Sequence, residues 1–185
     1  MGIKVVTKIK EKKLKNISFM VFMGFLLVTI GSSYYHLWPN NITLVYDRIP
    51  IAIIVMSFFA LIIYQCISPR KGYKALIIFN IIGLISVIYW IVTEHIGKGD
   101  LRWYGLVQFF PILAIPLMLG LYQSTFKQWK KVGLIFLLFA IARLFEKFDK
   151  ETYNFLNEII SGHSLKHLFM AAAGYEIVVL LRHRL

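Results

Sequence analysis

Apolar runs of about the length that crosses a bilayer recur along the whole chain, and this leaves few folds open. A membrane-spanning helix needs about 20 mostly apolar residues. The chain is 58% hydrophobic and only 16% charged, whereas soluble domains have about 25% charged residues. We therefore predict an all-α, polytopic transmembrane helical bundle that forms a single integral membrane domain over residues 1–185.

Six helices are predicted from these runs and from the turns that separate them. Pro50 is expected at the first turn of the second helix, where its missing N–H group costs nothing. Pro111 and Pro116 are expected to kink the fourth helix, because proline is tolerated inside membrane helices. The charged end of the fifth run is expected to extend beyond the bilayer as an amphipathic segment. The predicted spans, which follow a basic tail at 1–15, are 16–37, 50–67, 74–94, 104–123, 132–148 and 163–181.

The chain carries a net charge of +12, and the place of its basic residues favours membrane topology over nucleic-acid binding. Lys and Arg gather at loop ends rather than along an aromatic-studded stripe. Most of them lie in the amino-terminal tail, in the loops that include Lys71 and Lys127, and beside Arg184. The positive-inside rule then predicts cytoplasmic termini and an even number of spans. The expected location is the plasma or inner membrane.

The amino-terminal segment and the single cysteine bear on processing and compartment. The lysine-rich start followed by an apolar run is also typical of a signal peptide. No small-residue cleavage site follows cleanly, so the first helix is interpreted as retained. The single Cys66 excludes an intramolecular disulfide framework and says little about compartment.

Two of the five histidines are spaced four residues apart where the last predicted helix begins. In a helix, His163 and His167 would lie on the same face one turn apart, close enough to hold one metal ion. A third histidine, His36, ends the first predicted helix, and the predicted topology puts all three at the outer side of the membrane. Three imidazoles leave a fourth position on Zn²⁺ open for water, as in hydrolytic zinc sites. We therefore predict that His36, His163 and His167 are zinc ligands.

Two further residues are candidates for catalysis beside that metal. Ser32 lies four residues before His36, hence on the same helical face, where its hydroxyl could reach a developing oxyanion. Asp47 could act as the general base that accepts a proton from the attacking water. A carboxylate just before Pro50 is also typical of a helix cap, so that role stays open for Asp47. Ser33 is the alternative to Ser32, although it faces another direction.

Polar and aromatic residues near these candidates have mostly simpler interpretations. Ser161 is expected to cap the last helix, and Lys166 is expected to extend toward the membrane interface. Trp38 and Tyr104 are typical of the aromatic belt at a membrane surface. They also remain candidate substrate-binding residues, and the Tyr104 hydroxyl could donate a hydrogen bond to an oxyanion.

The Ser-x-x-x-His sequence, the Asp eleven residues later and the His-x-x-x-His sequence resemble motifs of the alkaline ceramidase family. That family belongs to a superfamily of membrane hydrolases that includes the adiponectin-receptor-like proteins, and the stretch 161–168 is similar to small bacterial members. The resemblance implies hydrolysis of the amide bond of ceramide, a membrane lipid, to a sphingoid base and a fatty acid. It also implies that the zinc-site set is Ser32, His36, Asp47, His163 and His167.

Two departures from the family pattern lead to further expectations. The family has seven helices, and this chain has room for six, so the first family helix is expected to be absent. Eukaryotic members bind calcium through an acidic amino-terminal segment. Here that segment is lysine-rich and contains only Glu11, so no calcium site is predicted.

Other protein classes could use the same histidines. A membrane haem or electron-transfer protein also ligates its cofactor through histidines on facing helices. That alternative gives no role to Ser32 or Asp47. A transporter would use intramembrane His and Asp along a path through the bilayer, but here these residues cluster at one end. An intramembrane zinc protease is disfavoured because the chain contains no His-Glu-x-x-His sequence.

Overall fold

The computed structural model describes residues 2–122 and 128–182, and the described chain is all helical, as predicted. It divides into two compact units, Met1–Phe126 and Lys127–Leu185. The basic residues Lys127 and Arg184, which the topology prediction uses, lie outside the described residues. The helices are α1 (Gly2–Lys8), α2 (Lys12–Leu37), α3 (Asn41–Cys66), α4 (Pro69–His95), α5 (Arg102–Leu121), α6 (Trp129–Lys147), α7 (Asp149–Phe155) and α8 (Gly162–Arg182).

Five of these helices are long and apolar enough to cross a membrane, namely α2, α3, α4, α5 and α8. By length and composition they indicate an integral membrane protein. Helix α6 is also long, but basic residues at its start and charged residues at its end leave it outside this group. The first predicted span, 16–37, begins four residues earlier than predicted, at Lys12, and the basic segment before it contains the short helix α1.

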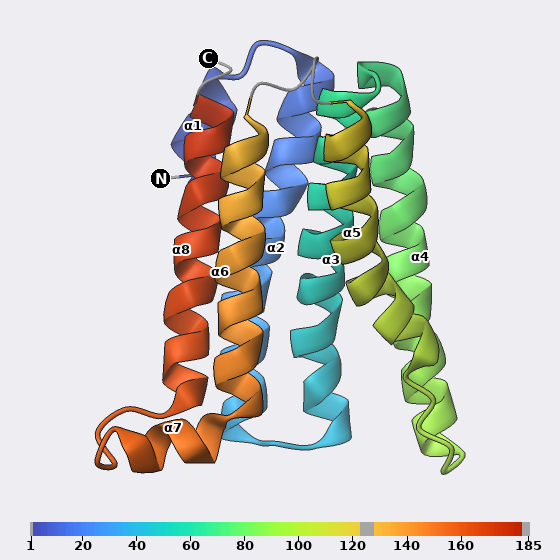
Figure 1. Cartoon of the computed structure of the whole chain (residues 1–185). Helices are drawn as coiled ribbons and strands as arrows, with labels where there is room; N and C mark the ends of the chain where they lie inside the picture. The colour runs from blue at the N-terminus through green and yellow to red at the C-terminus, as the bar shows by residue number, and fades with distance from the viewer. Residues whose placement is uncertain (1, 123–127, 183–185) are drawn as a thin grey trace. The chain divides into compact units, whose positions relative to one another are not determined.

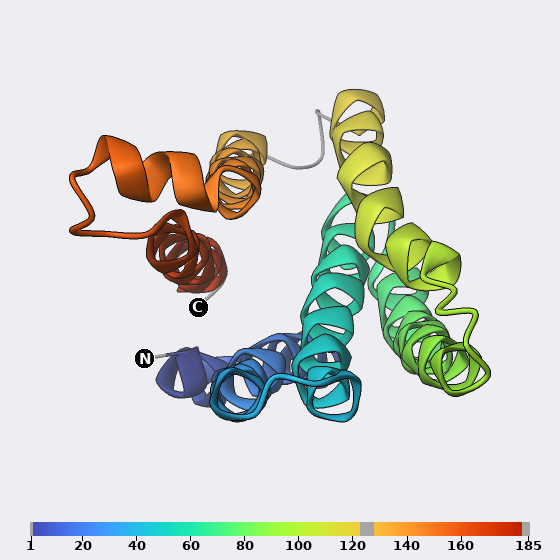
Figure 2. The same ribbon diagram turned by 90° about the horizontal axis from the view of Figure 1, so that it is seen from below.

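In the first unit, α3 is the central helix and packs against α2, α4 and α5. Figure 1 and Figure 2 show α3 between α2 and α4, with α5 beside α3 and α4. Accordingly, 67% of its most apolar window is buried, against 33% or less for the other candidate spans. One core cluster joins α3 to α4 and α5, and its buried members are Ala52, Met56, Val87, Trp90, Tyr104 and Val107.

Helix α3 begins at Asn41, nine residues before the predicted start at Pro50. The Asn40 side chain accepts hydrogen bonds from the backbone of Ile42 and Thr43, and the Thr43 hydroxyl accepts one from Asn40 N–H. This capping box satisfies N–H groups that a helix start leaves open. Pro50 is therefore buried inside the helix, as proline can be in membrane proteins. The prediction failed because the proline was taken as the stronger start signal.

The turn between α2 and α3 makes these helices an antiparallel pair, and Gly31 lets their backbones approach closely. A Cβ atom at Gly31 would lie 1.9 Å from the Tyr46 carbonyl oxygen and 3.3 Å from the Asp47 backbone nitrogen. Since those are backbone atoms, the helices would have to move apart to make room. The absence of a side chain at Gly31 thus holds the end of α2 against the second turn of α3.

We expect Gly31→Ala to lower the thermal stability of the purified protein in detergent. The added methyl overlaps backbone, and overpacking typically costs about 1–3 kcal/mol. Gly105→Ala is the matched control, because Gly105 is also helical and a Cβ there meets nothing within 4 Å. Alanine should make that helix slightly more stable than glycine does. Equal melting temperatures for the two variants would contradict the close approach.

The second unit consists of α6 and α8 packed side by side, with α7 between them in the chain (Figure 1). The Phe145 and Phe169 rings stack with centroids 5.4 Å apart. Lys166 Nζ lies 3.1 Å from Glu146 Oε1, and Arg143 pairs with the same carboxylate. These contacts align the end of α6 with the start of α8. Lys166 therefore pairs within the protein, and its extension toward the membrane interface stays a prediction.

Candidate functional site

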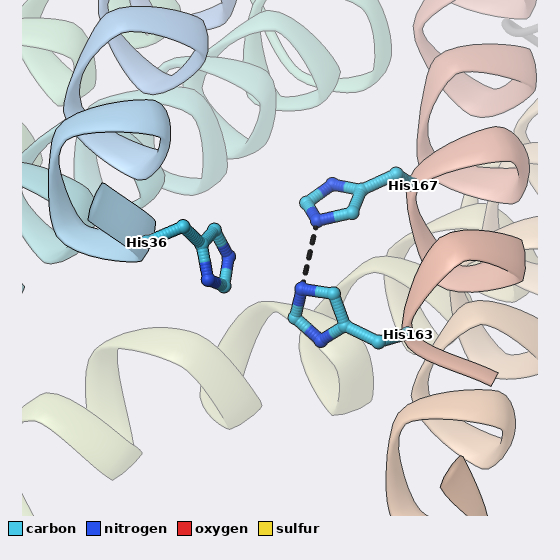
Figure 3. Close-up of side chains that lie close together, drawn as sticks. All are labelled: His36, His163 and His167. Carbon is cyan, nitrogen blue, oxygen red and sulfur yellow. Dashed lines mark hydrogen bonds between the residues drawn. The ribbon is translucent and has the colours of Figure 1, made fainter. Parts of the chain in front are cut away.

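His163 and His167 lie on successive turns at the start of α8 and face each other (Figure 3). Their Nε2 atoms are 3.0 Å apart, which is hydrogen-bond distance, with one ring as donor and the other as acceptor. The ring centroids are 4.8 Å apart and the planes cross at 74°. His163 is half-buried and His167 is exposed. The structure thus confirms that the predicted pair faces one point.

The geometry of the pair fits a shared metal ion. Tetrahedral Zn²⁺ with Zn–N bonds of about 2.0–2.1 Å holds two ligand nitrogens about 3.3 Å apart. The observed 3.0 Å separation is within a few tenths of an ångström of that value. Two neutral imidazole nitrogens at this distance need a proton or a cation between them, because their lone pairs would otherwise repel. The pair is therefore suited to bind a metal ion in place of the proton between its two nitrogens.

Three residues fix the backbone beneath the pair. The Ser161 hydroxyl oxygen accepts a hydrogen bond from Ser164 N–H, which confirms the predicted cap. Asp149 Oδ1 accepts one from His163 N–H at 2.6 Å. A Cβ atom at Gly162 would lie 2.3 Å from the Phe145 carbonyl oxygen, so only glycine fits there. The start of α8 is thereby held against α6 and α7, and the orientation of the histidine pair with it.

His36 lies in the last turn of α2, in the other compact unit. Its side chain is exposed, and its ring centroid is 5.3 Å from that of Tyr35. Figure 3 shows the ring projecting from the end of the helix. Like His163 and His167, His36 offers an imidazole nitrogen of the kind that zinc takes as a ligand.

Within the first unit, the structure brings the backbones of the two predicted catalytic residues into the same region. Ser32 follows Gly31 directly, and Gly31 touches the backbone of Tyr46 and Asp47. Both Ser32 and Asp47 are half-buried. The Ser33 hydroxyl donates to the Thr29 carbonyl at 2.7 Å within its own helix, so it is already engaged. This favours Ser32 over Ser33.

Asp47 is not the cap of a helix. It lies in the second turn of α3, and the capping position belongs to Asn40. The interpretation of Asp47 as a helix-start residue is therefore wrong. A carboxylate inside a helix that could span a membrane is costly unless it has polar surroundings, and the role of Asp47 as general base stays a prediction.

The two candidate substrate-binding aromatics have different surroundings. Trp38 follows the last residue of α2, is 58% exposed and contacts Tyr34 edge to face. Tyr104 is only 7% exposed, and its hydroxyl accepts a hydrogen bond from Gln108 Nε2 at 2.7 Å. Tyr104 therefore belongs to the core of the first unit. Substrate contact remains a prediction for both residues.

Two residues, Arg48 and Asp149, have structural roles that the sequence analysis does not predict. Arg48 precedes the predicted second span, but it lies inside α3 and its guanidinium covers the Trp90 ring. Asp149 directly follows the fifth predicted span, 132–148, and no role is predicted for it. An arginine beside Asp47 and before a long apolar run was a usable signal for the first. No sequence signal connects Asp149 to His163, because their contact depends on the turn between α7 and α8.

Comparison of the chain with protein-family models, with curated proteins and with solved structures found no match. The functional assignment therefore depends on the chemistry of the residues described above.

Proposed function

We propose that this chain is a zinc-dependent membrane lipid amide hydrolase of the ceramidase type. It would cut ceramide or a related N-acyl lipid with water into a sphingoid base or other amine and a fatty acid. The observation that carries the proposal is the facing His163–His167 pair, whose nitrogens are spaced as two ligands of one metal ion. The resemblance to the alkaline ceramidase motifs supports the same activity.

We further propose that His36 completes the metal site with the pair on α8. Three neutral donors would leave the ion its full positive charge. Zinc held in this way lowers the pKa of a coordinated water to about 7 and polarises a carbonyl group. Asp149 would keep His163 in place through its backbone hydrogen bond.

The remaining steps fall to Asp47 and Ser32. The Asp47 carboxylate would accept a proton from the attacking water and return it to the departing amine nitrogen. Protonating that nitrogen is necessary, because an amide anion is a poor leaving group. The Ser32 hydroxyl would donate a hydrogen bond to the carbonyl oxygen as negative charge develops there. Asp47 and Ser32 would thus supply proton transfer and an oxyanion hydrogen bond, which the three metal-ligating histidines would not provide.

The proposal is tested by purifying the protein in detergent, measuring its metal content and screening N-acyl lipids for release of fatty acid. We expect about one zinc per chain and amide hydrolysis that a zinc chelator abolishes and added zinc restores. Ester analogues of the active lipid in the same screen report whether the enzyme prefers amides. Zinc-free protein, or hydrolysis that a chelator leaves unchanged, would contradict the proposal.

We also propose that both termini lie in the cytoplasm and that the catalytic residues face the other side of the membrane. The support is the placement of the basic residues. A fluorescent reporter that folds only in the cytoplasm, fused after Leu185, should therefore be bright. An enzyme reporter that is active only outside the cytoplasm should be inactive at the same position. The reverse pattern would overturn this orientation.

A further inference from the structure

Arg48 is a charged residue that the proposed hydrolysis does not use, and it lies inside an apolar helix against two buried aromatic rings. It lies about 10 Å along α3 from Asn41, within a helix that could cross a membrane. Its guanidinium carbon is 3.7 Å from the centroid of the Trp90 ring and 5.2 Å from that of Tyr104. Both rings are buried, at 2% and 7% exposure. The two rings thus form a rigid aromatic wall on one side of the cation.

One donor of the guanidinium is not satisfied. Its Nη1 atom is buried and has no hydrogen-bond partner among the residues that the structure describes. Arginine presents its donors in a planar fork that matches the oxygens of carboxylate and phosphate groups. A buried N–H group without an acceptor is unfavourable, so such an atom indicates a missing partner.

Nearby protein carboxylates do not fill that place. Asp47 and Glu94 are the acidic groups that act electrostatically on Arg48. A Glu94 oxygen already accepts a hydrogen bond from Asn41 Nδ2 at 2.7 Å. Asp47 is the neighbour of Arg48 on a helix, and consecutive helical residues point about 100° apart. These charges make the region polar without giving Nη1 an acceptor.

We propose that Arg48, backed by Trp90 and Tyr104, binds the oxyanion of an acyl lipid, either a head-group phosphate or the carboxylate of a fatty acid. The position near the end of a membrane-spanning helix suits the polar end of a lipid. The aromatic wall holds the fork in one orientation, and the anion supplies the acceptor that Nη1 lacks. This binding requires neither metal nor turnover, so it stands apart from the proposed hydrolysis.

The test uses Trp90 as a reporter, since it touches the guanidinium. The other three tryptophans, Trp38, Trp103 and Trp129, are replaced with Phe, and the protein is titrated in neutral detergent with lipids brominated on the acyl chain. The probes are a fatty acid, its methyl ester, a phosphatidylglycerol and a phosphatidylcholine. Bromine quenches a tryptophan only at short range. We expect at least one anionic probe to quench Trp90 at a roughly 10-fold to 100-fold lower concentration than its neutral counterpart.

Arg48→Gln should remove the difference in quenching between anionic and neutral probes. Arg48→Lys should retain only part of it, because lysine keeps the charge without the planar fork. The matched control is Arg102→Gln. Arg102 already pairs with Asp100 at 2.7 Å, and this contact holds the pKa of the Asp100 carboxyl well below its usual range. The Arg102→Gln substitution should leave the quenching of Trp90 unchanged. Unaltered helical circular dichroism shows that each variant is folded.

The two anionic probes identify the source of the ligand. A preference for the fatty acid over its ester assigns the site to a carboxylate, and a preference for phosphatidylglycerol over phosphatidylcholine assigns it to a phosphate. Equal quenching by charged and neutral probes would overturn the proposal. So would an anionic preference that survives in folded Arg48→Gln protein.

Discussion

Asp47→Asn is expected to leave the zinc content and fold intact and to lower the rate of lipid amide hydrolysis by about 10²–10⁴-fold. The amide has nearly the same shape as the carboxylate but cannot accept the proton of the attacking water. Because Asp47 lies inside α3 and does not cap it, the loss would not come from a weakened helix start. The measurements are the zinc content per chain and the turnover of the best N-acyl lipid from the screen.

Serine variants at the end of α2 provide the matched comparison. Ser32→Ala should lower turnover by about 10²–10³-fold, as expected for a lost oxyanion donor. Ser33→Ala should be close to normal, because the Ser33 hydroxyl is engaged with the Thr29 carbonyl. Full turnover in Asp47→Asn protein would rule out the base. Equal effects of the two serine variants would rule out a specific role for Ser32.

Replacing His163 or His167 with Ala should abolish measurable hydrolysis and weaken zinc binding. Loss of a residue that only hydrogen-bonds to a metal ligand lowers metal affinity by about 10–100-fold. Loss of a ligand should exceed that range. Zinc affinity is measured by competition with a chelator, and activity is measured at saturating zinc. The two variants should behave alike because the two Nε2 atoms face the same point.

A change on the same helix separates metal loss from structural damage. Ser164 is exposed and its side chain contacts that of Ser161 at the start of α8. Ser164→Ala leaves the histidine nitrogens and the Asp149 contact in place. It should keep zinc and activity. If His163→Ala protein retained zinc affinity equal to that of Ser164→Ala protein, the pair would not be a metal site.

The histidine pair could be predicted from the sequence because its geometry is local. A spacing of four residues puts two side chains on one face of any helix, whatever the rest of the chain does. The cap at Ser161 is predictable for the same reason. The start of α3 also has a local sequence signal, the Asn40–Thr43 capping box, but Pro50 is a competing signal for a helix start.

What the sequence could not provide depends on contacts between distant segments. The backbone contact of Gly31 with Tyr46 and the hydrogen bond from His163 to Asp149 join residues on different helices. Arg48 precedes the predicted helix start at Pro50, and its place inside α3 follows only from the start of that helix at Asn41. Helix α6 was predicted from its apolar residues, but its charged ends distinguish it from the five candidate spans.

The central claim is that one zinc ion is held jointly by His36 of the first unit and the pair of the second. The most direct test measures zinc per chain in wild-type, His36→Ala and His95→Ala proteins after dialysis against a weak chelator. His95 is the control, because it ends α4 in the same unit as His36 and its Nδ1 lies 3.0 Å from the Ile91 carbonyl oxygen. We predict about one zinc in the wild-type and His95→Ala proteins and little in His36→Ala. Full zinc in His36→Ala protein would contradict the claim.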